Sequence, residues 1–395
     1  MKKRLHIHSD NDTWAGSENM PGIFIQSKTL NDKFDVSFSY RYSKAYKKGM
    51  GKWVLKPLCK IFHVNDLTTI LHKIRKCFKP IMIFKYLALL IDILGFYVFF
   101  KRNKFDILHV NNGGYPAAVS CNAAVIAGKL AGIPKITYMI NSSAFNKWWE
   151  KPITWAVKKS VTEFISASKH LRKTTDFLFE GDNWRIIPNT IKYRKPTVSK
   201  KKIREFYDIK DGETFVFGLG NLEERKGFQY LPKASKYLKD KYKLLICGDG
   251  EKKKEIITNI IKNDVSNKCA LITESPFHDY DLINACDIFV LPSLKDEDFP
   301  NVLLMALMYG KGIFSTNVAG IPEIVKDSGG AYADFRYVFG QKKDSITVIN
   351  CITRGVNNYK KSTKPKKKFN ENYKENVVIQ KYIDLWEGNK TNIWE

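Results

Sequence analysis

The chain has 395 residues, which suggests two or three domains at about 150 residues each. Hydrophobic residues make up 44% and charged residues 27% of the chain, a composition that excludes a disordered or fibrous class. Lysine and arginine outnumber aspartate and glutamate by 66 to 40, and this positive excess indicates an anionic partner: nucleic acid, a membrane surface or a phosphorylated ligand.

The amino-terminal residues predict a strand rather than a secretory signal. Basic residues occupy positions 2–4, but Leu5–His8 follows without an apolar signal segment and is expected to form the first strand. The seven cysteines are odd in number and contain no Cys-x-x-Cys pair, so they support neither a disulfide framework nor a structural zinc site. A cytosolic protein with reduced thiols is therefore expected.

Short apolar runs alternate with helical stretches along the rest of the chain. Further strands are expected at 105–110, 135–140, 164–167, 185–187, 214–218, 243–247, 270–272, 287–291 and 312–315. Continuous apolar strands separated by helices are typical of a parallel sheet with helices on both faces. The sequence therefore predicts an α/β fold.

Residues 41–104 carry half of the positive excess, with fifteen Lys and Arg against only two acidic residues. They include the most apolar window of the chain, 81–100, which Lys85 and Asp92 interrupt. A membrane-spanning helix would be long enough, but each of these charges would cost about 2.5–3.5 kcal/mol near the bilayer centre. The alternatives are a buried helix covering the sheet, and a helix that packs partly on the domain and partly enters an anionic membrane interface.

The alternation breaks between about Pro188 and Gly212, a lysine-rich stretch that we interpret as an interdomain linker. We predict an N-terminal parallel-sheet domain of residues 1–190 and a C-terminal one of residues 191–372. A mostly helical stretch, 373–395, would follow. Ligands of such sheets bind beyond the carboxyl ends of the strands, here in a cleft between the domains.

The second half carries the turns that indicate a chemistry. Gly220–Gly227 and Gly248–Glu251 each follow an expected strand and precede a helical stretch. A glycine turn ahead of a helix presents backbone N–H groups to an anion, and Lys226 adds a positive charge. Farther along, Glu297 lies near a junction between a loop and a helix, where its carboxylate can accept hydrogen bonds from a sugar.

In their order, these motifs resemble the GT-B-fold retaining glycosyltransferases of the large family 4 type, the glycosyl transferases group 1. Gly220–Gly227 (GNLEERKG) is similar to that family's G-R-L-x-x-x-K-G phosphate turn, and Gly248–Glu251 to its G-x-G-x turn. The segments Glu297–Leu304 (EDFPNVLL) and Ala319–Val325 (AGIPEIV) follow in the family's order, and Trp14–Glu18 falls where the family has a Gly-Gly-Ala-Glu loop.

The resemblance implies two Rossmann-like domains facing a central cleft. The nucleotide-sugar donor would bind the C-terminal domain and the acceptor the N-terminal one, with the last helix packing back on the N-terminal domain. The residues implied at the donor are Gly16, Asn221, Lys226, Gly248, Phe277, Glu297, Phe299, Asn301, Val302 and Met305. Those implied on the acceptor side are Gly113, Gly114 and Tyr115. Catalytic roles would fall to Glu297, His109 and Asn111, although His109 at a strand end can equally be structural.

Two positions depart from the family pattern. Met305 stands where the second of two paired glutamates would hold the ribose, and Met is a weak hydrogen-bond acceptor. Asn221 stands where the family has an arginine, so the diphosphate loses a bidentate partner there. These departures leave a second interpretation open: a catalytically degenerate relative that binds a partner or a membrane.

The expected activity is transfer of a hexose, with retention, from a nucleotide sugar to a glycan or lipid-linked acceptor. It would serve bacterial surface polysaccharide synthesis, such as capsule, O-antigen or lipopolysaccharide. Lys226 and helix N-termini would stabilise the leaving diphosphate, so no metal or other cofactor is expected. Nucleic acid is not an expected partner, because no recognisable nucleic-acid-binding signature occurs. We expect a cytoplasmic protein held peripherally on the inner face of the membrane, with residues 41–104 on its anionic surface.

Overall fold

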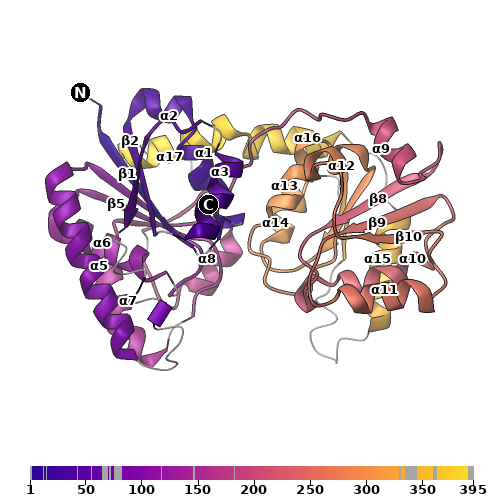
Figure 1. The fold of residues 1–395 in the computed structure, drawn as a ribbon, viewed down its shortest axis with the longest axis horizontal. Helices are drawn as coiled ribbons and strands as arrows, with labels where there is room; N and C mark the ends of the chain where they lie inside the picture. The colour runs from indigo at the N-terminus through magenta and orange to yellow at the C-terminus, as the bar shows by residue number, and fades with distance from the viewer. Residues whose placement is uncertain are drawn as a thin grey trace. The chain divides into compact units, whose positions relative to one another are not determined.

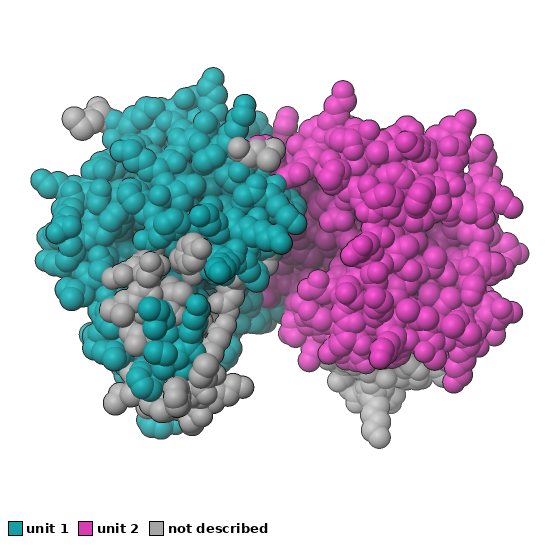
Figure 2. Space-filling view, in the orientation of Figure 1, with its two compact units in different colours: residues 1–190, 375–395 teal, residues 191–374 magenta. Residues whose placement is uncertain are grey.

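The computed structural model describes residues 2–11, 13–14, 16–41, 43–54, 56–64, 70, 73–74, 82–116, 118–145, 147–181, 183–328, 331–333, 345–358 and 363–389. The chain divides into two compact units, which Figure 2 shows in different colours. Unit 1 comprises residues 1–190 and 375–395, and unit 2 comprises residues 191–374. The second boundary falls two residues after the predicted position, 372.

Unit 1 is built on a parallel sheet that has seven strands in the described part of the chain, in the order β3-β2-β1-β4-β5-β6-β7. The strands are β1 (Arg4–Asp10), β2 (Asp35–Arg41), β3 (Lys60–Val64), β4 (Ile107–Asn112), β5 (Lys135–Ile140), β6 (Glu163–Ser166) and β7 (Trp184–Ile186). Strands β2 and β3 were not among the predicted runs. The apolar signal of β2 is interrupted by serines that the fold buries.

Those serines pair with histidines of β1 inside the unit. His6 lies with Nδ1 2.8 Å from Ser37 Oγ and Nε2 2.8 Å from Ser39 Oγ. His8 continues the network with Nδ1 2.9 Å from Ser39 Oγ and Nε2 2.9 Å from Ser120 Oγ. Because their hydrogen bonds are made internally, these polar residues are tolerated in the core.

Helices cover both faces of this sheet (Figure 1). The helical segments of unit 1 are η1 (Gly16–Glu18), α1 (Asn19–Phe24), α2 (Lys28–Lys33), α3 (Lys44–Trp53), α5 (Met82–Asn103), α6 (Val119–Ala131), η2 (Trp148–Glu150), α7 (Lys151–Ser160), α8 (Lys169–Thr175) and α17 (Glu375–Glu387). Helices α5 and α6 pack side by side. On its other side α6 approaches the sheet closely, because a Cβ at Gly128 would lie 2.7 Å from Leu108 Cδ2 of β4.

Helix α17 brings the end of the chain back to unit 1. Its Tyr382 and Trp386 rings pack edge-on against Phe24 of α1. The Trp386 indole N–H also donates to Thr137 Oγ1 of β5 at 3.2 Å. The carboxyl-terminal helix therefore belongs to the core of the first unit.

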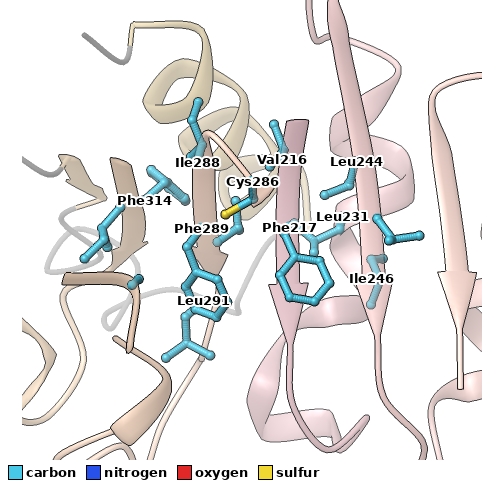
Figure 3. Close-up of a cluster of buried hydrophobic side chains, with 14 of the residues drawn as sticks. Val216, Phe217, Leu231, Leu244, Ile246, Cys286, Ile288, Phe289, Leu291 and Phe314 are labelled. Atoms are coloured by element: carbon cyan, nitrogen blue, oxygen red, sulfur yellow. The ribbon is translucent and has the colours of Figure 1, made fainter. Parts of the chain in front are cut away.

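Unit 2 has a second parallel sheet, six-stranded among the described residues, in the order β10-β9-β8-β11-β12-β13. The strands are β8 (Thr214–Leu219), β9 (Tyr242–Cys247), β10 (Cys269–Ile272), β11 (Ile288–Leu291), β12 (Gly312–Thr316) and β13 (Ala331–Ala333). The first five lie where apolar runs predicted strands. Figure 3 shows side chains from neighbouring strands, including Val216, Leu244 and Ile288, meeting in one buried cluster.

The helical segments of unit 2 are α9 (Lys200–Phe206), η3 (Glu224–Lys226), η4 (Phe228–Tyr230), α10 (Leu231–Ser235), α11 (Lys253–Lys262), α12 (Asp279–Ala285), α13 (Asn301–Met308), α14 (Ile321–Val325), α15 (Ser345–Asn357), α16 (Lys364–Lys368) and a π-helical turn, η6 (Phe369–Tyr373). Helix α9 lies inside the stretch predicted to be a linker. It packs against α12. The chain before it is fixed by Asp281, which accepts from Thr197 N at 2.7 Å and from Thr197 Oγ1 at 2.8 Å. The prediction of a linker reaching to Gly212 was therefore wrong from about Thr197 onward.

The apolar window predicted at 81–100 begins just outside the described residues and otherwise forms α5. Among the described residues, no helix combines the length and apolar character that crossing a membrane requires. Leu89, Phe96 and Phe100 of α5 are buried against the unit. This inner face fits the interpretation of α5 as a helix that covers the sheet. Several residues of the basic segment 41–104, among them 65–69 and 75–81, lie outside the described residues.

Candidate functional site

Two loops of unit 2 meet at the point in the sheet where the order of successive strands reverses. From β8 the chain proceeds to β9 and β10 on one side, while β11, β12 and β13 lie on the other. The loops that follow β8 and β11 therefore leave neighbouring strands in opposite directions, the usual place for a ligand in an open parallel sheet. Gly227 shows how closely they approach: it has a φ of +72°, and a Cβ there would lie 2.1 Å from the Pro292 carbonyl oxygen. Only glycine fits this crossing.

A buried carboxylate lies at this crossing. Glu297 follows β11 and is only 5% exposed. The ammonium group of Lys226, from the loop after β8, is ion-paired with Glu297 Oε1. The Ser293 hydroxyl donates to the same oxygen at 2.9 Å. Two residues singled out from the sequence as separate features thus form one ion pair across 71 positions of the chain.

Arg225 supplies a second cation that the sequence analysis did not assign to the site. Its Nη1 lies 3.5 Å from Glu297 Oε1 and donates to the Asp296 carbonyl at 3.0 Å. Its Nε lies 2.7 Å from a carboxylate oxygen of Glu223. Asn221 lies close by, because its amide donates to the other Glu223 oxygen at 3.4 Å. A guanidinium therefore lies near the position where the family pattern has arginine and this chain has asparagine. The sequence could have indicated this role for Arg225, because it lies in the same turn, directly before Lys226.

Other predicted donor residues gather at the same carboxyl edge of the sheet. Gly248, after β9, has a φ of +156°, and a Cβ there would lie 2.0 Å from the Gly220 carbonyl oxygen. Phe277 follows β10, but its ring packs against Phe206 and Tyr207, with centroids 5.1 and 6.0 Å away. Phe277 therefore also stabilises α9 against the loop after β10.

The loop after β11 leads directly into α13. Asn301 and Val302 form its first turn, preceded by the half-buried Phe299, whose ring lies 5.9 Å from that of Tyr373. Their N–H groups belong to the turn in which a helix has no intrahelical acceptors. Met305 follows in the next turn and is half-buried against the apolar cluster of unit 2. In this structure its side chain contributes to packing.

In unit 1 the order of successive strands reverses between β1 and β4, and the loops after these two strands also meet. Asn111 at the end of β4 is fully buried and donates to Ser9 Oγ at 3.0 Å and to the Ser17 carbonyl at 3.2 Å. Its own Oδ1 accepts from Asn141 Nδ2 at 2.8 Å. Asn111 thus holds the loop that contains Gly16 rather than pointing to solvent.

His109 lies in the core and not at the exposed end of its strand. It packs edge-on against Phe24, Tyr382 and Trp386, and its Nδ1 lies 3.0 Å from Thr137 Oγ1. Burial lowers the pKa of His109 to about 3. A ring enclosed by α1 and α17 cannot contact a substrate, so the structural alternative holds for His109 and we assign it no catalytic role.

The predicted acceptor-side turn contributes its backbone. A Cβ at Gly113 would lie 3.3 Å from Asn11 Nδ2, and the Gly114 N–H donates to Asn112 Oδ1 at 2.8 Å. Tyr115 is fully buried, and its hydroxyl lies 2.7 Å from Thr154 Oγ1. The Tyr115 side chain therefore anchors the turn to the core of unit 1 and does not face an acceptor.

A second buried carboxylate, Glu18, was quoted in the sequence motif without a role. Ser9 Oγ donates to its two oxygens at 3.0 and 2.9 Å, and the Tyr46 hydroxyl donates to Oε2 at 2.5 Å. Burial raises the pKa of Glu18 to about 7. Since Ser9 also bonds Asn111, this network fixes the loop after β1.

Among the described residues, no group of three or more His, Cys, Asp and Glu side chains could hold a metal ion. Independence from divalent metals remains a prediction for experiment.

Comparisons with known proteins show what the chain is similar to. Residues 199–374 match the family model described as "Glycosyl transferases group 1". The chain is 25% identical over 281 residues to the UDP-Gal:alpha-D-GlcNAc-diphosphoundecaprenol alpha-1,3-galactosyltransferase of Escherichia coli, with 67% of this chain and 69% of that protein covered.

Solved structures match nearly the whole chain. HepE of Anabaena in complex with UDP matches with a TM-score of 0.70 and 14% identity, covering 98% of this chain and 100% of that one. The lipopolysaccharide outer core galactosyltransferase WaaB matches with a TM-score of 0.69 and 13% identity, covering 98% and 99%. The chain therefore has the GT-B fold of the glycosyltransferases that it resembles, and its residues 199–374 match the glycosyl transferases group 1 family.

Proposed function

We propose that the protein transfers a hexose, with retention, from a nucleotide-sugar donor to a lipid-linked glycan acceptor in surface polysaccharide synthesis. This proposal rests on the cluster of Lys226, Arg225 and Glu297, which lies in unit 2 where the strand order reverses between β8 and β11. Two cations beside a buried carboxylate suit a ligand with a diphosphate next to a sugar, because one end needs positive charge and the other needs hydrogen-bond acceptors.

The contacts of these side chains support a role for each of them in this proposal. Lys226 and Arg225 now neutralise Glu297, and a bound diphosphate would draw on both cations. Glu297 would then accept hydrogen bonds from the sugar hydroxyls, with Ser293 keeping the carboxylate oriented. As the sugar–phosphate bond breaks, the two cations stabilise the charge that develops on the leaving diphosphate. The departing phosphate, on the face where the acceptor attacks, would assist removal of the acceptor proton.

Two relatives suggest the substrates. One is named for UDP-galactose and a diphosphoundecaprenol acceptor, and another was crystallised with UDP. We therefore propose a UDP-sugar as the donor and a polyprenyl diphosphate-linked saccharide as the acceptor. A lipid acceptor would keep the protein on the inner face of the cytoplasmic membrane as a peripheral protein.

The test is a two-stage screen. Thermal shift and hydrolysis with UDP-, GDP-, ADP- and CMP-sugars identify the donor. Transfer to a synthetic diphospholipid carrying N-acetylglucosamine is then followed by mass spectrometry, and NMR of the new linkage reports retention or inversion. A β-linked product from an α-linked donor would refute retention.

The second candidate function is binding without catalysis, which Met305 and Asn221 favour because both positions lack the expected polar contacts to the donor. The screen separates the two. Donor binding without hydrolysis or transfer, across all four nucleotide classes, would support the degenerate relative.

A further inference from the structure

Helix α5 presents apolar side chains to solvent. Leu87, Leu90, Leu94 and Val98 follow one another at intervals of three or four residues and so lie along one face of the helix. All four are exposed, Leu90 at 62% and Leu94 at 65%. The stripe spans twelve residues, about 16 Å at the rise of an α-helix. Single exposed leucines are ordinary, but a continuous stripe of this kind marks an interaction surface.

The two charged residues within the apolar window of this helix, Lys85 and Asp92, have the opposite orientation. Asp92 is buried, and Lys85 is ion-paired with Glu150, which is buried too. A helix that faced only water would have its charges outside and its leucines inside. In α5 the outward side chains between positions 87 and 98 are apolar, whereas Lys85 is ion-paired and Asp92 is buried. The outer stripe is therefore suited to an apolar environment.

Exposed aromatic side chains also lie on η2 and α7, next to the start of α5. Trp148 is 73% and Trp155 65% exposed, and Phe145 just before them is exposed as well. The Tyr86 hydroxyl donates to the Trp149 carbonyl, which with the Lys85–Glu150 ion pair holds the start of α5 beside η2. We call Leu87, Leu90, Leu94, Val98, Phe145, Trp148 and Trp155 the outer face.

The exposed charge around the outer face is mostly positive. Residues 82–161 contain ten Lys and Arg and three acidic residues. Of the three acidic residues, Asp92 and Glu150 are buried and Asp106 is exposed. Lys101, Arg102, Lys151, Lys158 and Lys159 are exposed on α5 and α7. An apolar surface bordered by positive charge complements an anionic bilayer, with leucines and tryptophans in the interface and lysines at the headgroups.

We propose that the outer face of α5, η2 and α7 is the surface on which this protein docks to an anionic membrane. The proposal deepens the proposed function, since a lipid-linked acceptor would be met at that membrane, but docking itself needs no turnover. The segments that carry Phe145 and Trp148 follow β5, at the same carboxyl edge of the unit 1 sheet as Gly113 and Gly114 after β4. Docking through the outer face would hold that edge, with the predicted acceptor-side turn, near the lipid headgroups.

Flotation of the purified full-length chain with vesicles tests the proposal. We expect binding to vesicles that contain phosphatidylglycerol, weak binding to phosphatidylcholine alone, and a steep loss with added salt. The double variants Leu90→Ser/Leu94→Ser and Trp148→Ser/Trp155→Ser should each lower the partition coefficient about tenfold, which corresponds to about 1.4 kcal/mol. Ile261→Ser is the matched control, because Ile261 on α11 of unit 2 is 70% exposed and apolar but lies off the outer face.

Each result decides the proposal. Equal partitioning of the Leu90/Leu94 variant, the control and the unchanged protein would overturn it. A second result would also overturn it: the protein does not bind vesicles, but light scattering shows a concentration-dependent dimer that Leu90→Ser/Leu94→Ser dissociates. The outer face would then be an interface with a second copy of this chain. All variants should keep the unfolding midpoint of the unchanged protein, because the replaced side chains are exposed. Vesicle binding without sugar transfer would retain this inference and reject the proposed activity, and transfer to a soluble acceptor without vesicle binding would do the reverse.

Discussion

Replacing Lys226 by methionine removes an ammonium group on which two different properties depend. In the ligand-free protein Lys226 neutralises Glu297, so its loss leaves a buried carboxylate with Ser293 and the more distant Arg225. In the donor complex, as we propose it, the same ammonium binds the diphosphate. Lys226→Met should therefore lower both the stability of the fold and the affinity for a nucleoside diphosphate.

The magnitudes follow from the environment of the pair. Leaving a buried charged group short of one partner costs about 1–3 kcal/mol, and we expect the lower half of that range because Arg225 remains. The lost contact to the diphosphate is a charge-assisted hydrogen bond worth about 1.5–3 kcal/mol, which corresponds to roughly a tenfold to a hundredfold weaker Kd. Adding Glu297→Gln should recover much of the stability, because no charge is then left unpaired, but should not recover the affinity.

Calorimetric titration with UDP and with UMP, together with urea unfolding, measures both effects. The preference for UDP over UMP should collapse in Lys226→Met and fall partially in Arg225→Gln. Lys268→Met is the control: Lys268 pairs with Asp240 just before β10, at the opposite edge of the sheet, and should leave the affinity unchanged. An unchanged affinity of folded Lys226→Met for UDP would refute our placement of the diphosphate.

Four further predictions concern other parts of the molecule. Met305→Glu should weaken nucleotide binding, because it puts a second carboxylate on the helix that follows Glu297; tighter binding by about 1–2 kcal/mol in calorimetry would instead mean that ribose recognition had been lost at this position. Because burial raises the pKa of Glu18 to about 7, the folded protein keeps a proton that the unfolded chain releases near pH 4.5. The free energy of unfolding should therefore fall as the pH rises from 4.5 to 7, by at most about 3 kcal/mol, and Glu18→Gln should remove that slope in urea titrations. His109 has the opposite effect on the pH dependence, because burial lowers its pKa to about 3. The free energy of unfolding should therefore decrease as the pH falls below 6.5, by about 1.4 kcal/mol per pH unit, and His109→Gln should reduce this slope by that amount. Sugar transfer should survive EDTA; a loss of rate that Mg²⁺ or Mn²⁺ restores would contradict metal-independent chemistry.

The sequence was sufficient for the parts of the fold whose signal is local. Strands such as β5 and β11 are continuous apolar runs, because both faces of a parallel sheet are covered, and they were predicted almost to the residue. The turns Gly220–Gly227 and Gly248–Glu251 could be read because a crossing of two backbones accepts only glycine. The order of such turns along the chain was also enough to indicate the family.

The tertiary structure alone decided which side chains face each other. Strand β2 escaped prediction because its serines are buried only through hydrogen bonds to the histidines of β1. His109 is in the core because a helix more than 260 residues later covers it. Lys226 and Glu297 form one cluster with Arg225, and Leu87, Leu90 and Leu94 of α5 face outward while Asp92 faces inward. A local pattern records how apolar each residue is, but the partner that buries or neutralises it comes from a distant segment, and that partner determines its role.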